Sequence, residues 1–247
     1  EKPMTRVVLR LGAKLSHTPA AIIFNSQVAA RQYEAFGFPA DRTVLIPNGF
    51  DCDQYQPRPD ARARLCQAFG IDEKATIVGM IARMHPMKDP ENLVKAVRRA
   101  RATGHDLHLM IIGHGSDDPH SGLAKAIAAA LPANRVTTAG HRQDIADWLP
   151  GFDIFALPSA WGEGFPNVIG EAMACGVPCV ATDVGDSGWI IGGNGRVVPP
   201  RDPEALAQAL IGLDQMGPEA RRKIGASARA RVIETFSLPT IVRQYEE

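Results

Sequence analysis

Two glutamates stand eight positions apart, Glu163 and Glu171, in the segment EGFPNVIGEAMACGVP. Pro166 is suited to the first position of a helix, because its ring fixes φ and its missing N–H would have no helical partner there. Gly176 is typical of the residue that ends a helix. The spacing therefore predicts a helix over about 166–175, with one carboxylate in the loop before it and the other on its first turns.

The start of that helix is a predicted anion site. The backbone N–H groups of Asn167 and Val168 would be free of helical partners and would attract a phosphate. Glu163 and Glu171 would flank the same place, and carboxylates accept hydrogen bonds from hydroxyl groups. We therefore expect a ligand with phosphate in the middle and hydroxylated rings on either side. The open alternative is that both glutamates only stabilise the helix start, at less than about 1 kcal/mol.

A second group of residues could bind anions. Arg83 follows the apolar run TIVGMIA at 76–82, and Lys88 comes five residues later, before a predicted helix. Two cations at the end of a strand could neutralise a diphosphate without a metal ion. The alternative is a pair of solvated basic side chains.

Composition bounds the function. The chain has 247 residues, with 27 basic and 27 acidic side chains, and this balance gives no reason to expect nucleic acid as a partner. No apolar run approaches the length of a membrane span. The four cysteines form no CxxC pair, which favours buried thiols in a reducing cytoplasm over a zinc site.

The elements that must position these residues alternate along the chain. Most candidate strands are continuous apolar runs, which is typical of strands buried on both faces of a parallel sheet. They are expected at 21–24, 43–47, 76–82, 107–113, 135–140, 152–158, 178–182 and 195–199. Helical patterns separate most of them, so we predict an α/β fold with a Rossmann-like, doubly wound parallel sheet, in which residues 76–199 supply six strands.

Four regions are expected. Residues 1–47 read as the tail of a truncated N-terminal α/β domain, and 48–60 as an interdomain linker rich in Pro and Asp. Residues 61–235 would form the second domain. Residues 236–247 would form a C-terminal helix that packs back toward the N-terminal domain.

The motifs resemble a known family. PNGFD, GMIARMHPMKDPENLVKAV, LMIIGHGSD and EGFPNVIGEAMACGVPCVATDVG follow one another in the order and spacing of group-one, or family-four, retaining glycosyltransferases of GT-B fold. The similarity extends from about Ile22 to the end of the chain, and it implies that residues 61–235 form the nucleotide-sugar donor-binding domain and that the truncated domain of residues 1–47 would bind the acceptor. It implies transfer of a sugar from a nucleotide-diphosphate sugar to a glycan, lipid or other acceptor, with retention of configuration and without a metal or other cofactor.

The resemblance also implies residue roles. Arg83 and Lys88 would hold and stabilise the leaving diphosphate, and Glu163 would contact the donor sugar near its reacting face. These three form the expected catalytic group. The expected donor-binding residues are Gly79, Arg142, Asn167, Val168 and Glu171, with Arg142 near the base and Glu171 on the ribose hydroxyls.

One segment departs from the family pattern. Many relatives carry a Pro-Glu pair facing the donor after the ATDVG motif, whereas this chain has Asp186 and Ser187 there. The donor-sugar contacts of this segment are therefore left open. Asp51 and Asp53, which could suggest a metal site, lie in the linker, and only Asp51 fits the resembled pattern.

Other expectations concern partners and location. A cytoplasmic enzyme of polysaccharide biosynthesis is expected, with the inner face of a membrane as the alternative place. The basic stretch 220–223 is ordinarily a solvated helix face, and contact with anionic lipid is its alternative. The fragment alone is expected to bind donor but transfer little or no sugar. A nucleotide-sugar epimerase and a catalytically silent nucleotide-binding module are the rival functions.

Overall fold

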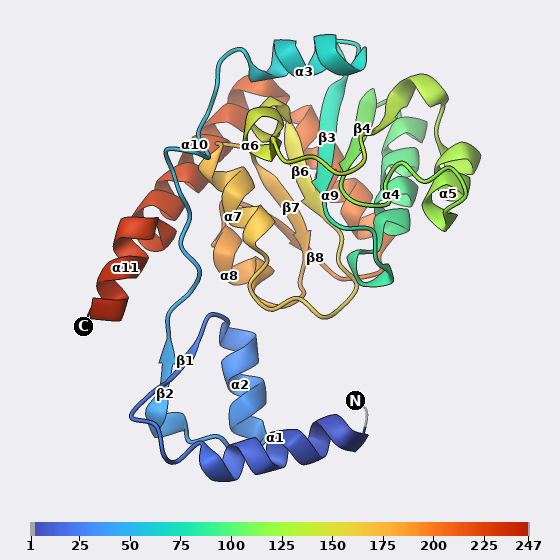
Figure 1. Ribbon diagram of the computed structural model, residues 1–247. Coiled ribbons are helices and arrows are strands. Elements are labelled where there is room, and N and C mark those ends of the chain that lie inside the picture. Colours follow the sequence, from blue (N-terminus) through green and yellow to red (C-terminus); the bar gives the residue numbers. More distant parts are fainter. Residues whose placement is uncertain (1–2, 247) are drawn as a thin grey trace.

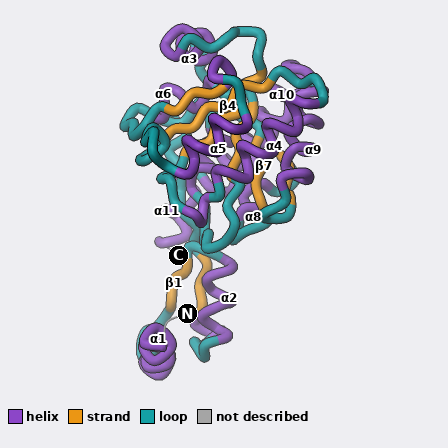
Figure 2. Tube along the Cα trace, turned by 90° about the vertical axis from the view of Figure 1, so that its right-hand side faces the viewer, coloured by secondary structure: helices purple, strands orange, loops and turns teal. Residues whose placement is uncertain are grey.

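The computed structural model describes residues 3–246, which form a large α/β unit and a small N-terminal unit joined by an extended linker (Figures 1 and 2). The N-terminal unit contains α1 (Pro3–Leu15), β1 (Ile22–Phe24), α2 (Gln27–Ala35) and β2 (Thr43–Leu45). Its two strands pair in parallel in a sheet of their own.

The large unit is built on a six-stranded sheet in which every pair is parallel. Its strands are β3 (Thr76–Ile81), β4 (Leu107–Ile112), β5 (Val136–Thr138), β6 (Ile154–Leu157), β7 (Cys179–Thr182) and β8 (Gly195–Val198). The spatial order is β5-β4-β3-β6-β7-β8, so the order reverses between β3 and β6. This confirms the predicted doubly wound fold, and it places the expected ligand crevice at the carboxyl ends of those two strands.

Helices cover both faces of the sheet. One face packs against α3 (Ala61–Phe69), α6 (Ile145–Trp148), α7 (Asn167–Ala174), α8 (Ser187–Ile191) and α10 (Gly217–Phe236). The other face packs against α4 (Pro90–Ala102), α5 (Gly122–Ala130) and α9 (Pro203–Gln215). Apolar side chains of the strands alternate between these two cores, as in β4, where Leu109 and Ile111 face one core and Met110 and Ile112 the other.

Two helices were not among the sequence predictions. After β7, Ser187–Ile191 forms the short helix α8, which ends at Gly192 in a left-handed conformation. The helix α3 begins at the predicted domain boundary and likewise ends at a left-handed glycine, Gly70. Both are short, so their apolar periodicity in the sequence is weak.

The linker is attached to the C-terminal helices. The Phe50 N–H donates to the carbonyl of Phe236, and the Leu238 N–H donates to the carbonyl of Phe50. The Phe50 ring also lies against Phe165 and Phe236 with centroid distances of 6.1 and 6.5 Å. The last helix, α11 (Leu238–Glu246), therefore starts beside the linker (Figure 1).

Candidate functional site

A cavity of about 780 Å³ lies at the carboxyl ends of β3, β4, β5 and β6. Seven of the eight predicted site residues line it: Arg83, Lys88, Arg142, Glu163, Asn167, Val168 and Glu171. They come from three separate loops and one helix, because parallel strands bring the loops at their carboxyl ends to one edge of the sheet. The cavity is therefore at the topological switch point of the fold.

The N-terminus of α7 supplies backbone donors to this cavity. The helix begins at Asn167, and Pro166 is its N-cap in an extended conformation, so the helix starts one position later than predicted. Within the described chain, the N–H groups of Asn167 and Val168 donate to no protein acceptor. The Asn167 side chain is engaged, because its Oδ1 accepts from Nδ2 of Asn48 at 2.7 Å. Two free N–H groups at a helix start make a local positive end suited to a phosphate.

The two predicted cations differ in their surroundings. Nζ of Lys88 lies 2.6 Å from Oε1 of Glu163, and these side chains are only 18% and 7% exposed. Ser159, which is fully buried, donates its hydroxyl to the same carboxylate oxygen at 2.5 Å. Arg83 is exposed and has no ion pair in the part of the chain that the structure describes. It is therefore free to bind an incoming anion, whereas Lys88 is already held by Glu163.

Arg142 is positioned by a local ion pair. Its Nε and Nη2 donate to the two carboxylate oxygens of Asp144 at 2.8 and 2.6 Å. The hydrogen bonds from Arg142 lower the pKa of Asp144 to about 2. The guanidinium also lies over the rings of Trp148 and Phe69, with centroid distances of 5.0 and 5.8 Å. These contacts hold a planar cation at one end of the cavity.

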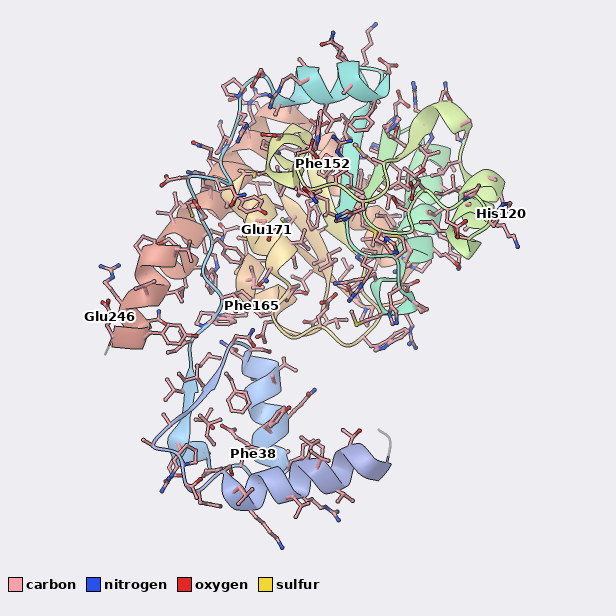
Figure 3. All side chains as sticks on the ribbon, viewed as in Figure 1. Phe38, His120, Phe152, Phe165, Glu171 and Glu246 are labelled. Atoms are coloured by element: carbon pink, nitrogen blue, oxygen red, sulfur yellow. The ribbon has the colours of Figure 1, made fainter. Side chains whose placement is uncertain are left out.

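Glu171 lies on α7 and lines the cavity (Figure 3). Burial raises its pKa above the usual range of a glutamate. Burial first, and then the nearby Glu171, raise the pKa of Tyr55 to about 12. A half-buried carboxyl and a phenol therefore line the cavity, and both can form hydrogen bonds with ligand hydroxyls.

Gly79 is the predicted site residue that does not line the cavity. It lies in the middle of β3, is buried and does not line the cavity. A Cβ placed on it would be 2.1 Å from the ring of Phe152, which is labelled in Figure 3. A glycine is required here because an aromatic ring packs directly on the strand, and its donor-binding role stays a prediction.

The structure also explains why Asp186 stands where many relatives have a Pro-Glu pair. This side chain is 2% exposed, and it accepts hydrogen bonds from the N–H groups of Gln27 and Val28 at 2.7 and 3.1 Å. Its own N–H donates to the carbonyl of Gly164 at 2.8 Å. Asp186 thus joins the start of α2 to the loop that carries Glu163. The short segment gave no signal for this contact, because the partners are 159 and 158 positions apart.

Residues outside the predicted set also line the cavity, among them Tyr55, His85, His114 and His141, and Ser159 supports it through Glu163. His114 and His141 follow strand ends, and that position was their only signal in the sequence. Ser159 is recognisable only through its contact with Glu163.

Neither a cluster of metal ligands nor a membrane-spanning helix is found among the described residues. Over residues 3–246, no three His, Cys, Asp or Glu side chains gather in a way that could hold a metal ion. Asp51 instead accepts from the N–H groups of Asp53 and Gln54 at 3.0 and 2.9 Å, which closes a turn in the linker. No helix in this range combines the length and apolarity needed to cross a bilayer.

Comparison with known proteins decides the family. Residues 75–215, more than half of the chain, match the family described as "Glycosyl transferases group 1". The chain belongs to the group 1 glycosyltransferases. The lipopolysaccharide core biosynthesis mannosyltransferase LpsB of Rhizobium meliloti is 31% identical over 205 residues, which is 79% of this chain and 57% of that protein.

Other relatives and solved structures agree. A GDP-mannose-dependent alpha-(1-6)-phosphatidylinositol monomannoside mannosyltransferase of Mycolicibacterium smegmatis is 28% identical over 96% of this chain and 63% of its own length. The crystal structure of HepE from Anabaena in complex with UDP and glucose is 28% identical, with a TM-score of 0.86 over 98% of this chain and 66% of that one. The group 1 chain therefore spans about half to two thirds of the length of these relatives, and its α/β architecture is that of the GT-B glycosyltransferases.

Proposed function

We propose that the chain forms the donor-binding part of a retaining glycosyltransferase, which moves a sugar from a nucleotide-diphosphate sugar to a glycan or lipid acceptor without a metal ion. One observation carries this proposal. Arg83, with no ion-pair partner in the described chain, and the open N–H end of α7 line one cavity with Glu171, so diphosphate-binding and hydroxyl-binding groups occur together. Relatives support it, since HepE was solved with UDP and glucose and a relative is named as GDP-mannose-dependent.

The geometry suggests how the residues divide the work. Negative charge develops on the diphosphate as the sugar leaves, and Arg83, Lys88 and the α7 N–H groups are placed to stabilise it. The N–H groups are fixed by the helix, so their part of the stabilisation costs little rearrangement at the moment of reaction. Cations of this kind can take the part that a metal ion plays in other phosphate chemistry.

Glu163 is assigned to the donor sugar. Its carboxylate is held by Lys88 and Ser159 on one oxygen, Oε1, so it is oriented before any ligand arrives. We assign it to sugar orientation and to stabilisation of positive charge on the ring. Retention would then follow from departure and attack on the same face of the sugar, with Glu163 acting as an electrostatic group.

The chain alone is proposed to bind donor and to transfer little sugar. It spans 57% of LpsB and 66% of HepE, and the acceptor would be bound largely by the part of such relatives that this chain does not match. A cytoplasmic location, with contact to a membrane face through a lipid-linked acceptor, is part of the same proposal. Robust sugar transfer by the purified 247-residue chain would contradict the proposal that it transfers little sugar alone.

Calorimetric titration with UDP-, GDP- and ADP-sugars tests the proposal. Sugars of one nucleotide class should bind, and Arg83→Ala should weaken their binding by about 1.5–3 kcal/mol, the scale of a charge-assisted hydrogen bond. Arg10→Ala is a matched control, because Arg10 is also exposed but lies on α1, outside the cavity. Unchanged affinity in Arg83→Ala would refute the assignment of Arg83.

A further inference from the structure

A second cavity, of about 560 Å³, is also lined by residues of the loops after β3 and β4. It is lined by the first turns of α4 and α5 and by the loops after β6 and β8. The two cavities share one lining residue, His85, in the loop that also carries Arg83 and Lys88. The second cavity is therefore separate from the donor cavity and adjacent to it.

Backbone strain is concentrated around this second cavity. Over the residues that the structure describes, two non-glycine residues have positive φ angles, Asp89 at 46° and Arg201 at 58°. Both line the second cavity, although they are 112 positions apart in the chain (201 − 89). Strained backbone of this kind persists where surrounding contacts enforce it, and it clusters at ligand-binding sites.

The side chains of this cavity are suited to a flat ligand with hydroxyl groups. Trp161 lines it and is 45% exposed, although large aromatic side chains are normally much more buried. The guanidinium of Arg201 lies over the Trp161 ring, 5.1 Å from its centroid, so hydrogen-bond donors stand beside an aromatic surface. Asn92, only 3% exposed, also lines the cavity, and its Nδ2 has no hydrogen-bond partner in the described structure.

Charge distinguishes this cavity from its neighbour. It is lined by two carboxylates, Asp89 and Glu91, and by two cations, Lys95 and Arg201, so their formal charges cancel. The donor cavity instead has three Arg or Lys side chains against two glutamates, together with the free N–H groups of α7. A balanced set of donors and acceptors around an aromatic ring favours an uncharged, hydroxylated ring over a phosphate.

We propose that this second cavity, bounded by Trp161 and Arg201, binds a neutral saccharide unit of the acceptor. The proposal rests on the proposed function only in assigning that saccharide to the acceptor. Trp161 is two residues before Glu163, and the N–H of Ala160 donates to the carbonyl of Met87, beside Lys88, at 2.8 Å. A glycan held there would therefore lie beside the loops that carry the proposed catalytic group.

A ligand-observed NMR titration of the 247-residue chain tests the site, with neutral disaccharides of mannose, glucose and N-acetylglucosamine as probes. At least one disaccharide should show saturable binding. Trp161→Ala should weaken it about tenfold or more, the scale expected from a lost aromatic contact, while Trp161→Phe should keep most of it. Met216→Ala, an exposed apolar side chain outside the cavity, is the control and should change nothing.

A second variant covers the case in which Trp161→Ala does not fold. Arg201→Gly removes the cation and places a glycine at a φ of 58°, a conformation that glycine adopts readily. The variant should fold with an unfolding temperature at or above that of the parent and should lose disaccharide binding. Retention of full binding by a folded Arg201→Gly or Trp161→Ala variant would overturn the proposal.

A competition experiment distinguishes the saccharide site from the proposed donor site. A nucleoside diphosphate should leave disaccharide binding intact, and inorganic phosphate should not reproduce the disaccharide response. Displacement of the disaccharide by either anion, or no disaccharide binding up to the solubility limit, would overturn the saccharide site. Nucleotide binding that depends on Arg83 would still stand in that case, so the two proposals fail separately.

Discussion

The ion pair between Lys88 and Glu163 leads to a prediction about ligand affinity. Lys88 Nζ lies 2.6 Å from Glu163 Oε1, so a diphosphate must compete with Glu163 for the ammonium group. Glu163→Gln keeps an acceptor for Lys88 and Ser159 but removes the negative charge. Lys88 then keeps a charge-assisted hydrogen bond to a neutral oxygen and loses only the attraction between the two charges, so it becomes easier to recruit by about 1 kcal/mol. Glu163→Gln should therefore bind a nucleoside diphosphate about fivefold more tightly.

Calorimetric titration with the nucleoside diphosphate measures this effect, because that ligand lacks the sugar that Glu163 is proposed to contact. The Lys88→Met background is the matched control. With the ammonium group absent, Glu163→Gln should no longer tighten binding through Lys88, and the double-mutant cycle isolates the pair. Weaker or unchanged binding by the single Glu163→Gln variant would refute the competition between Glu163 and diphosphate.

Three further variants test the packing, the contact between the units and a buried histidine. Gly79→Ala forces a methyl group to within 2.1 Å of the Phe152 ring and should lower the free energy of unfolding by about 1–3 kcal/mol or more, measured by denaturant titration. Asp186→Ala removes both hydrogen bonds to the start of α2, so hydrogen exchange should accelerate across α2 (Gln27–Ala35). Burial lowers the pKa of His108 from 6.5 to about 4, so its contribution to stability is present above pH 6.5 and is lost as the pH falls toward 4. His108→Phe should flatten the pH dependence of unfolding in that window.

Matched controls are available for these variants. Gly212→Ala lies in α9 with open space around the new methyl group, so it should be neutral or stabilising. Asp183→Ala changes an exposed carboxylate in the same turn as Asp186 and should leave α2 exchange unchanged. His120→Phe changes an exposed histidine and should leave the pH profile as it is. Equal effects in a variant and its control would contradict the corresponding prediction.

Much of the fold was predictable because each strand and most helices are encoded locally. Buried parallel strands need continuous apolar runs, and all six predicted runs between 76 and 199 are strands of the sheet. The start of α7 was predicted to within one residue, since proline chemistry acts on its own backbone. Local encoding failed for α8, whose five residues are too few to show a period.

Local sequence also indicated which residue types would gather at the site, and the parallel topology explains why they do. Loops that follow parallel strands must meet at one edge, so Arg83 and Asn167 could be assigned to one site from their positions after strands. That reasoning did not extend to Gly79, which the resemblance implied and which lies inside β3, outside the cavity lining. The position of a residue in a motif does not show that an aromatic ring 73 positions away in the chain packs against it (152 − 79).

The sequence by itself determined the order of strands and helices, the helix start that offers free N–H groups, and the cations and carboxylates available for chemistry. Only the tertiary structure decided which of these groups are already paired. Lys88 meets Glu163 across 75 positions, and Asp186 meets α2 across more than 150, whereas Arg83 has no ion-pair partner in the described chain. The physical reason is that hydrogen bonds and ion pairs act over a few ångströms in space, and separation along the chain does not fix that distance.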